Sequence, residues 1–220
     1  MLEVSHIRKT YGKKVILEDI SLKANCGECI AIVGRNGCGK TTLMQILAGA
    51  LKPDAGEIRF FGNNPLKKRK FFPEYVGYVP QDPPLLEELS VKDNLKLWGV
   101  LKSEYFSTIN SMFSLDEIMN MKVEKLSGGM KRRLGIACAI ATLPSILLLD
   151  EPTTALDLYY KESIQKWLQQ YREMKGIILL TSHDEKEILS CDRCLVMHQG
   201  NLLELSGDQF TIDHIKKYIK

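Results

Sequence analysis

The sequence predicts an α/β fold in which parallel strands alternate with helices. Two observations lead to this prediction. First, an apolar run, a glycine-rich turn and a helical pattern follow one another between Cys29 and Leu47. Second, three later apolar runs have the length of buried strands; they are Val76–Val79, Ser145–Leu149 and Ile177–Thr181. A chain of 220 residues, 45% of them hydrophobic, can bury a sizeable core in such a fold.

Composition and charge argue against several classes of protein. The net charge of +3 is too weak to indicate a nucleic-acid or lipid partner, and the basic run Lys67–Lys70 has the character of a solvated loop. No apolar run approaches the ~18 residues of a membrane span. Charged residues interrupt the first twenty positions, which excludes a signal peptide. We therefore expect the chain to stay in the cytoplasm.

The chain begins with two strand patterns. Residues 2–10 alternate between apolar and polar side chains, Tyr11 and Gly12 interrupt the pattern, and a second strand is predicted over Val15–Leu22. The aromatic ring of Tyr11 could pack in the core or stack on a nucleotide base, and the residues alone leave both open. A further short strand, Ile58–Phe61, follows a turn at Lys52–Gly56.

A phosphate-binding loop is predicted between the first buried strand and the helix after it. The pattern G-x-x-x-x-G-K-[ST] requires glycines that free the backbone N–H groups to face phosphate oxygens. The lysine supplies a positive charge for the β- and γ-phosphates, and the hydroxyl after it is the expected Mg²⁺ ligand. The residues of the loop are Gly34, Arg35, Asn36, Gly37, Cys38, Gly39, Lys40, Thr41 and Thr42.

A helical region separates two parts of the α/β pattern. Helical spacing of apolar residues runs from Val91 to about Asn120. The segment Leu126–Met130 follows, in which Ser127 is a good helix cap and two glycines leave free N–H groups at a positive helix end. This helix end could hold an anion or be an ordinary capped terminus. Lys131–Arg133 are predicted to face away from the apolar side of the helix.

Polar residues follow the carboxyl ends of the buried strands. Asp150 and Glu151 end one strand, Gln81 follows another after Pro80, and His183 follows a third. Ligands of open α/β sheets bind at the carboxyl ends of the strands, so these residues and Gly34 should meet at one site. There, Asp150 suits Mg²⁺ coordination through water, and Glu151 could polarise a water molecule for attack on a γ-phosphate.

The remaining chain completes the α/β pattern. Thr154–Asp157 leads into a helix predicted over Leu158–Met174, Leu195–Glu204 is predicted to be a hairpin, and Gly207–Lys220 should be a helix with a basic end.

Six cysteines include two C-x-x-C pairs, Cys26 with Cys29 and Cys191 with Cys194. The pairs are much farther apart than the ~15–20 residues between the two halves of a zinc ribbon. Cys29 and Cys194 also begin apolar runs. We interpret these cysteines as small buried hydrophobic residues in preference to a metal or redox site.

Taken together, the motifs resemble those of the nucleotide-binding subunit of an ATP-binding cassette (ABC) transporter, over nearly the whole chain. Gly34–Thr42 is similar to the Walker A motif, Leu126–Met130 to the signature sequence and Ile146–Glu151 to Walker B with the catalytic glutamate. Gln81 is similar to the Q-loop residue, Thr154–Asp157 to the D-loop and His183 to the switch histidine. Tyr11 falls where the family stacks an aromatic ring on adenine.

The resemblance implies one ABC ATPase domain over residues 1–220. Its core would be a P-loop NTPase (RecA-like) fold with an N-terminal antiparallel β subdomain and an all-helical insert at about residues 84–142. ATP and Mg²⁺ would be the ligands, with Thr41, Gln81 and Asp150 at the metal. A transmembrane permease and a second ABC subunit would be the partners. The chain would then lie on the cytoplasmic face of the membrane, bound through its permease.

The resemblance also implies how the residues act. Two subunits would close head-to-tail over two ATP molecules, so that Ser127, Gly128 and Gly129 of one cap the γ-phosphate held by the other. Glu151 would orient or deprotonate the attacking water. His183 would hold the γ-phosphate and link it to Glu151 and, across the interface, to Asp157. Gln81 would report the nucleotide state to the permease, and Lys40 would hold the phosphates.

The sequence departs from the family's commonest pattern at a few positions. Met130 stands where glutamine is usual, and with Lys131–Arg133 it resembles cassettes that export drugs, peptides or lipids. Arg35 and Cys38 replace smaller residues without removing a backbone donor. The competing hypothesis is a soluble cassette ATPase that acts on nucleic acid or ribosomes, but such relatives usually carry two cassettes or a long coiled-coil insert. We therefore expect no nucleic-acid partner.

Overall fold

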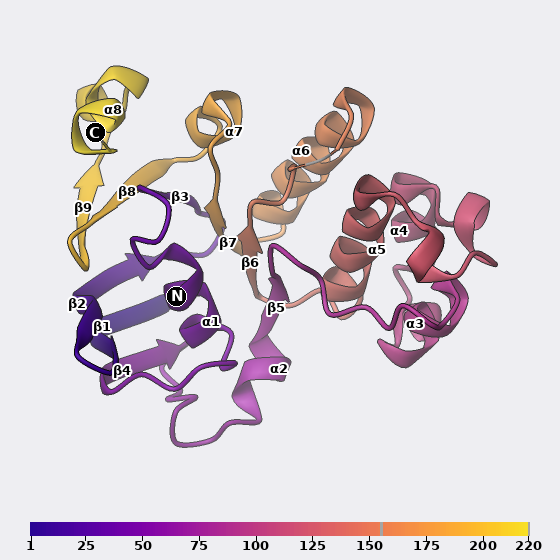
Figure 1. Cartoon of the computed structure of the whole chain (residues 1–220), viewed down its shortest axis with the longest axis horizontal. Helices are drawn as coiled ribbons and strands as arrows, with labels where there is room; N and C mark the ends of the chain where they lie inside the picture. Colours follow the sequence, from indigo (N-terminus) through magenta and orange to yellow (C-terminus); the bar gives the residue numbers. More distant parts are fainter. Residues whose placement is uncertain (155, 220) are drawn as a thin grey trace.

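The computed structural model describes residues 1–154 and 156–219 and shows a mixed α/β fold, as predicted (Figure 1). The strands are β1 (Leu2–Tyr11), β2 (Lys14–Ala24), β3 (Cys29–Val33), β4 (Ala55–Phe60), β5 (Val76–Val79), β6 (Ile146–Asp150), β7 (Ile177–Thr181), β8 (Arg193–His198) and β9 (Asn201–Leu205). The helices are α1 (Lys40–Leu47), α2 (Phe71–Tyr75), α3 (Val91–Leu97), α4 (Phe106–Phe113), α5 (Gly128–Ile140), α6 (Leu158–Glu173), α7 (Glu185–Leu189) and α8 (Ile212–Ile219).

The strands form one curled sheet in the order β4-β1-β2-β9-β8-β3-β7-β6-β5. Strands β8, β3, β7, β6 and β5 are parallel to their neighbours in this run, whereas β4, β1 and β2 are antiparallel. Figure 1 shows the antiparallel strands on one side of the molecule and helices α3, α4 and α5 on the other. The predicted hairpin is also present, since β8 and β9 pair antiparallel.

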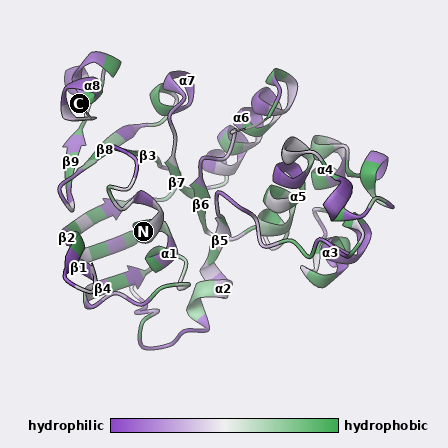
Figure 2. Ribbon diagram, viewed as in Figure 1, coloured by the Kyte–Doolittle hydropathy of each residue, from purple (hydrophilic) through white to green (hydrophobic). Residues whose placement is uncertain are grey.

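Two hydrophobic cores lie on the two faces of the parallel strands. Figure 2 shows that strands β6 and β7 consist mostly of hydrophobic residues. Side chains alternate between the cores along each strand. In β6, Leu147 and Leu149 join the core that includes α5 and α6, whereas Ile146 and Leu148 join the core that includes α1 and the antiparallel strands. Burial on both faces explains why these strands are uniformly apolar in the sequence.

The helical region between β5 and β6 is broken into short helices. Left-handed residues interrupt it: Gly99, with a φ of +76°, follows α3, and Ser114, with a φ of +48°, ends α4. Helix α5 ends at Ile140, four residues before Pro144. The boundaries of a separate helical subdomain at about residues 84–142 remain a prediction.

Candidate functional site

The phosphate-loop motif Gly34–Thr42 follows β3 directly and runs into the first turn of α1, as the sequence predicts. Two of its glycines have left-handed φ angles, +76° at Gly37 and +114° at Gly39. Gly39 is also tightly packed, because an added Cβ would lie 2.9 Å from the side chain of Leu17. A side chain at either position would strain the backbone, so glycine maintains the turn in which N–H groups can face a phosphate.

The Lys40 side chain lies over this loop and is 8% exposed. Its Nζ donates hydrogen bonds to the carbonyl of Gly34, at 2.8 Å, and to that of Arg35, at 3.2 Å. Helix α1 begins here, and its described first turn has neither a capping side chain nor an acidic residue. The ammonium group and the helix N-terminus therefore present positive charge at the same place, which suits a phosphate.

Strand register brings the other predicted residues to the same edge of the sheet. Ile32 of β3 lies opposite Thr181 of β7, which in turn lies opposite Asp150 of β6. Val79 of β5 lies opposite Leu149. The residues that follow these strand ends therefore leave the sheet at the same edge; they are Gly34, Gln81, Glu151 and His183.

Thr181 positions both acidic residues at the end of β6. Its hydroxyl donates to Asp150 Oδ1 at 2.5 Å and accepts from the backbone N–H of Glu151 at 3.0 Å. The carbonyl of Thr181 accepts from the same N–H at 3.1 Å. Sequence reasoning missed this role, although a polar residue at the end of an apolar strand was a usable signal.

The Glu151 carboxylate contacts the predicted switch histidine. Its Oε1 lies 3.4 Å from His183 Nε2, and its Oε2 accepts from the Thr154 hydroxyl at 3.3 Å. The Glu151 backbone has a φ of +53°, a conformation that costs about 1–3 kcal/mol outside glycine and is concentrated at functional sites. The surrounding hydrogen bonds therefore hold a carboxylate in one orientation at the edge of the sheet.

Asp150 meets the requirement for a magnesium ligand. Its side chain is 2% exposed, and within the described part of the chain its Oδ2 has no hydrogen-bond partner. A buried, unpaired carboxylate oxygen is costly unless a cation or water pairs with it. Thr41 lies in the first turn of α1, which packs against β6, and Gln81 follows the end of neighbouring β5. The residues present therefore fit Mg²⁺.

The signature helix lies away from the phosphate loop of its own chain. Ser127 caps α5, its hydroxyl accepting from the N–H of Met130 at 3.2 Å. Figure 1 shows α5 and α1 on opposite sides of β5 and β6. Gly128 is exposed and lines a cavity of about 370 Å³ with Gln81 and Thr154. The structure thus does not bring Ser127, Gly128 and Gly129 together with Lys40.

Asp157 and Tyr11 occupy exposed positions. The Asp157 carboxylate accepts from the N–H of Tyr160 at 3.1 Å and caps α6, while Ala155, within the predicted D-loop, lies outside the described residues. Tyr11 is 51% exposed at the end of β1, opposite Lys14. Lys14 is two residues before Ile16, whose side chain lies beside Gly39 of the phosphate loop. The ring is exposed, and Lys9 Nζ lies over it at 5.8 Å from the ring centroid.

Arg132 connects the elements of the site. The expectation that Lys131–Arg133 all face away from the core is wrong for two of these residues. Arg132 and Arg133 are each 4% exposed. The Arg132 guanidinium donates to five carbonyls, those of Pro80, Gln81, Asp150, Glu151 and Pro152. Burial lowers the pKa of Arg132 from its ordinary value. One cation therefore links the signature helix to the ends of β5 and β6.

Glu187 is a second residue that sequence reasoning missed. Its side chain is 2% exposed, and its Oε2 lies 3.5 Å from the hydroxyl of Thr153, two residues beyond Glu151. Burial raises the pKa of Glu187 from 4.5 to about 7. Glu187 lies in the short helix after His183, and nothing in the sequence around it indicates that this charged side chain is buried.

The Glu187→Gln variant should lose a specific pH dependence of stability. A carboxyl whose pKa is raised on folding stabilises the fold while protonated, and this contribution is lost as pH rises from 4.5 to about 7. Between pH 5.5 and pH 8, the free energy of unfolding should therefore fall by about 2 kcal/mol more in the wild type than in the variant. Urea unfolding at both pH values measures this, with exposed Glu185→Gln as control. Parallel profiles for wild type and Glu187→Gln would contradict it.

Comparison with known proteins gives a family profile described as ABC transporter, which matches residues 17–154. The chain is 35% identical over 219 residues to the spermidine/putrescine import ATP-binding protein PotA of Mycoplasma mycoides, covering 93% of this chain and 61% of PotA. It is 33% identical over 232 residues to the Nod factor export ATP-binding protein I of Sinorhizobium fredii, covering 99% of this chain and 67% of that protein. The chain thus spans about three fifths of the length of relatives such as PotA.

A solved structure agrees with these matches. The dimeric post-hydrolysis state of the ATP-binding cassette MJ0796, bound to ADP and Pi, superposes with a TM-score of 0.85 at 27% identity. The match covers 94% of this chain and 98% of that one. None of the helices described for this chain has the length and apolar character needed to cross a bilayer.

Proposed function

Since this chain belongs to the ABC transporter family and carries its ATPase domain, we propose that it hydrolyses ATP to drive a separate transmembrane permease. One observation carries the proposal. Glu151 is held by Thr181 and contacts His183 at the sheet edge where the phosphate loop begins. A fixed carboxylate beside a phosphate-binding loop is the arrangement that orients water toward a γ-phosphate.

The phosphate loop would bind the nucleotide. Loop N–H groups and Lys40 surround the phosphates, and the exposed ring of Tyr11 stacks on the base. Thr41, Asp150 and Gln81 would hold Mg²⁺, which when bound neutralises charge on the β- and γ-phosphates. The unpaired Asp150 Oδ2 supports this metal assignment.

Hydrolysis would then depend on Glu151. The carboxylate accepts a proton from the attacking water or orients it, a contribution of ~10²–10⁴-fold for a general base. His183, 3.4 Å from Glu151 Oε1, would keep the carboxylate in place and hold a phosphate oxygen. Thr181 is a positioning residue, because it acts by fixing Asp150 and Glu151.

A second ABC subunit would complete the site. Ser127–Gly129 form the start of α5, whose positive N-terminus suits an anion, yet this terminus lies away from Lys40 of the same chain. Head-to-tail pairing would place it over the γ-phosphate bound by the partner and would bring exposed Asp157 to the interface. The dimeric form of MJ0796 supports such pairing.

An apolar groove supports docking of the permease. The groove has a volume of about 620 Å³ and lies between the end of α1 and α2 on one side and α3 and α5 on the other. Its lining includes Phe72, Tyr78, Pro83, Leu85, Trp98 and Cys138. Trp98 is 45% exposed, and neighbouring Leu97 is 62% exposed. Such a groove fits a short amphipathic helix from a permease loop. It would place this chain on the cytoplasmic face of the membrane.

Export of drugs, peptides or lipids remains our prediction for the direction of transport, and it rests on Met130 and the basic residues after it. The relatives' names support both directions, since PotA is named for import and the Sinorhizobium fredii protein for export. Two of these basic residues, Arg132 and Arg133, also donate to carbonyls within the chain.

Capture of the partner tests the proposal. Tagged Glu151→Gln protein should be expressed in its host, trapped with Mg-ATP and purified from detergent-solubilised membranes. A polytopic membrane protein should co-purify, and its identity would indicate cargo and direction. The additional change Trp98→Glu should reduce its recovery at least fivefold, whereas exposed Lys166→Glu, outside the groove, should not. Recovery of the chain alone, or with nucleic acid or ribosomes, would overturn the assignment to a permease.

A further inference from the structure

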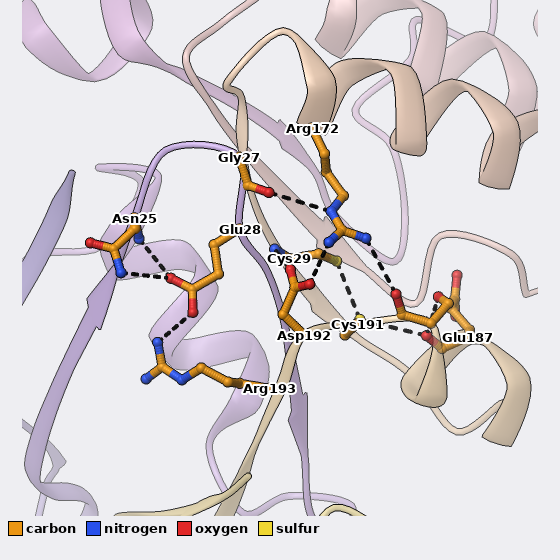
Figure 3. A network of polar contacts seen from close by, with 10 residues as sticks. Asn25, Gly27, Glu28, Cys29, Arg172, Glu187, Cys191, Asp192 and Arg193 are labelled. Carbon is orange, nitrogen blue, oxygen red and sulfur yellow. Dashed lines mark hydrogen bonds and ion pairs between the residues drawn. The ribbon is translucent and has the colours of Figure 1, made fainter. Parts of the chain in front are cut away.

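The two C-x-x-C motifs, which the proposed function does not use, meet in the folded chain. Cys29, the second cysteine of the first motif, lies with its Sγ 3.2 Å from the Sγ of Cys191, the first cysteine of the second motif. Figure 3 shows the two side chains facing each other between β3 and the segment after α7. Cys29 is 4% and Cys191 7% exposed. The described residues contain no cluster of histidine, cysteine and acidic side chains that could hold a metal ion.

Hydrogen bonds made by Asp192 fix the two cysteines relative to each other. The N–H of Cys29 donates to Asp192 Oδ2 at 2.8 Å, and the N–H of Asp192 donates to the Cys29 carbonyl at 2.9 Å. Arg172 holds Asp192 from the other side, and its Nη2 donates to Asp192 Oδ1 at 2.5 Å. Because Asp192 directly follows Cys191, this network keeps the two sulfurs in contact (Figure 3).

We propose that Cys29 and Cys191 form a reversible disulfide when the protein meets a low-molecular-weight disulfide oxidant. A disulfide has an S–S length of about 2.05 Å, so the two sulfurs need to approach by only about 1 Å. The pairing crosses between the two motifs, which distinguishes it from the pairing within each C-x-x-C unit that the spacing suggests. The proposal is independent of the proposed transport function.

A cavity gives the oxidant a path to one of the two thiols. It has a volume of about 600 Å³, lies against α6 and is lined by Cys29, Leu168, Arg172 and Ser190 among others. Cys29 lines this cavity, whereas Cys191 lies behind it, so the oxidant meets Cys29 first and Cys29 is the attacking sulfur. The hydrogen bond with Cys29, together with burial, raises the pKa of Cys191.

The reaction proceeds in two balanced steps of thiol–disulfide exchange. Cys29, as thiolate, attacks one sulfur of the oxidant, forming a mixed disulfide and releasing one thiolate of the reagent. The Cys191 sulfur then attacks the Cys29 sulfur of the mixed disulfide, and its proton goes to the released thiolate. The second half of the reagent leaves as a thiolate and takes up from solvent the proton that Cys29 lost when it ionised. Two protein thiols are oxidised, and one small-molecule disulfide is reduced to two thiols.

The cross-link would tie β3, which leads into the phosphate loop, to the segment between α7 and β8. It closes a loop of more than a hundred residues, and loops of that length give the largest loss of chain entropy in the unfolded state. The oxidised protein should therefore melt about 10 °C higher than the reduced protein.

Oxidised glutathione is the probe that tests this inference on the folded full-length chain. After incubation and denaturation, alkylation should label four of the six thiols, and peptide mapping should find Cys29 linked to Cys191. Dithiothreitol should release the link and return the melting temperature to its reduced value. Cys191→Ser should retain glutathione on Cys29 and show no rise in melting temperature. Exposed Cys26→Ser should still form the link and show the full rise.

Three results would overturn the inference. They are six alkylated thiols after oxidation, a link within either motif (Cys26 to Cys29 or Cys191 to Cys194), and glutathione adducts on other cysteines without the Cys29–Cys191 link. Each of these readouts is independent of ATP hydrolysis. Failure of the disulfide and failure of the proposed function can therefore be told apart.

Discussion

Lys40→Ala should weaken ATP binding by about a hundredfold or more, because a charge-assisted contact with two phosphates is lost from a largely buried position. The alanine variant leaves the loop carbonyls of Gly34 and Arg35 without their cationic donor but keeps the glycine-dependent turn. Equilibrium binding of a fluorescent ATP analogue measures the effect.

The matched control for this variant is Lys13→Ala, which removes an exposed lysine between β1 and β2. It should bind the nucleotide analogue as the wild type does. Thermal melting should show that Lys40→Ala remains folded. A folded Lys40→Ala protein that binds the analogue with wild-type affinity would show that the loop Gly34–Thr42 does not hold the phosphates.

Glu151→Gln should reduce ATP hydrolysis by about 10²–10⁴-fold while changing ATP affinity by less than about threefold. Glutamine fills the same volume and can still contact His183 and Thr154, but it cannot accept a proton from water. Release of phosphate in a single-turnover experiment separates the chemical step from binding.

Glu185→Gln is the matched control for the catalytic variant. Glu185 is an exposed acid at the start of α7, where it pairs with Lys216, and it is not one of the residues assigned to the site. Its hydrolysis rate should equal that of the wild type. Hydrolysis at the wild-type rate in Glu151→Gln would remove Glu151 from the role of base and leave the orientation of water to another group.

Local patterns predicted much of the fold and the edge of the sheet where the site lies. Glycine spacing located the phosphate loop, and apolar runs ending in polar residues located Asp150, Glu151 and His183, because both signals depend on neighbours in the sequence. The strand register then brought these residues together, as the rule for open α/β sheets requires.

Long-range contacts could not be predicted in the same way. Arg132 is in a helix but bonds to carbonyls of Pro80 and Pro152, and a single sequence gives no sign of that packing. Burial of Glu187 against Thr153 and the meeting of Cys29 with Cys191 likewise depend on contacts between residues far apart in the sequence. The stacking of Tyr11 on adenine remains a prediction.

The sandwich of two subunits over ATP is the central claim, and sedimentation of purified Glu151→Gln protein tests it most directly. The protein should sediment as a monomer without nucleotide and as a dimer with saturating Mg-ATP. Ser127→Arg in the same background should remain a monomer while still binding ATP, because its helix N-terminus could no longer approach the partner's γ-phosphate. A Glu151→Gln protein that binds Mg-ATP yet stays monomeric at high micromolar concentration would contradict the account.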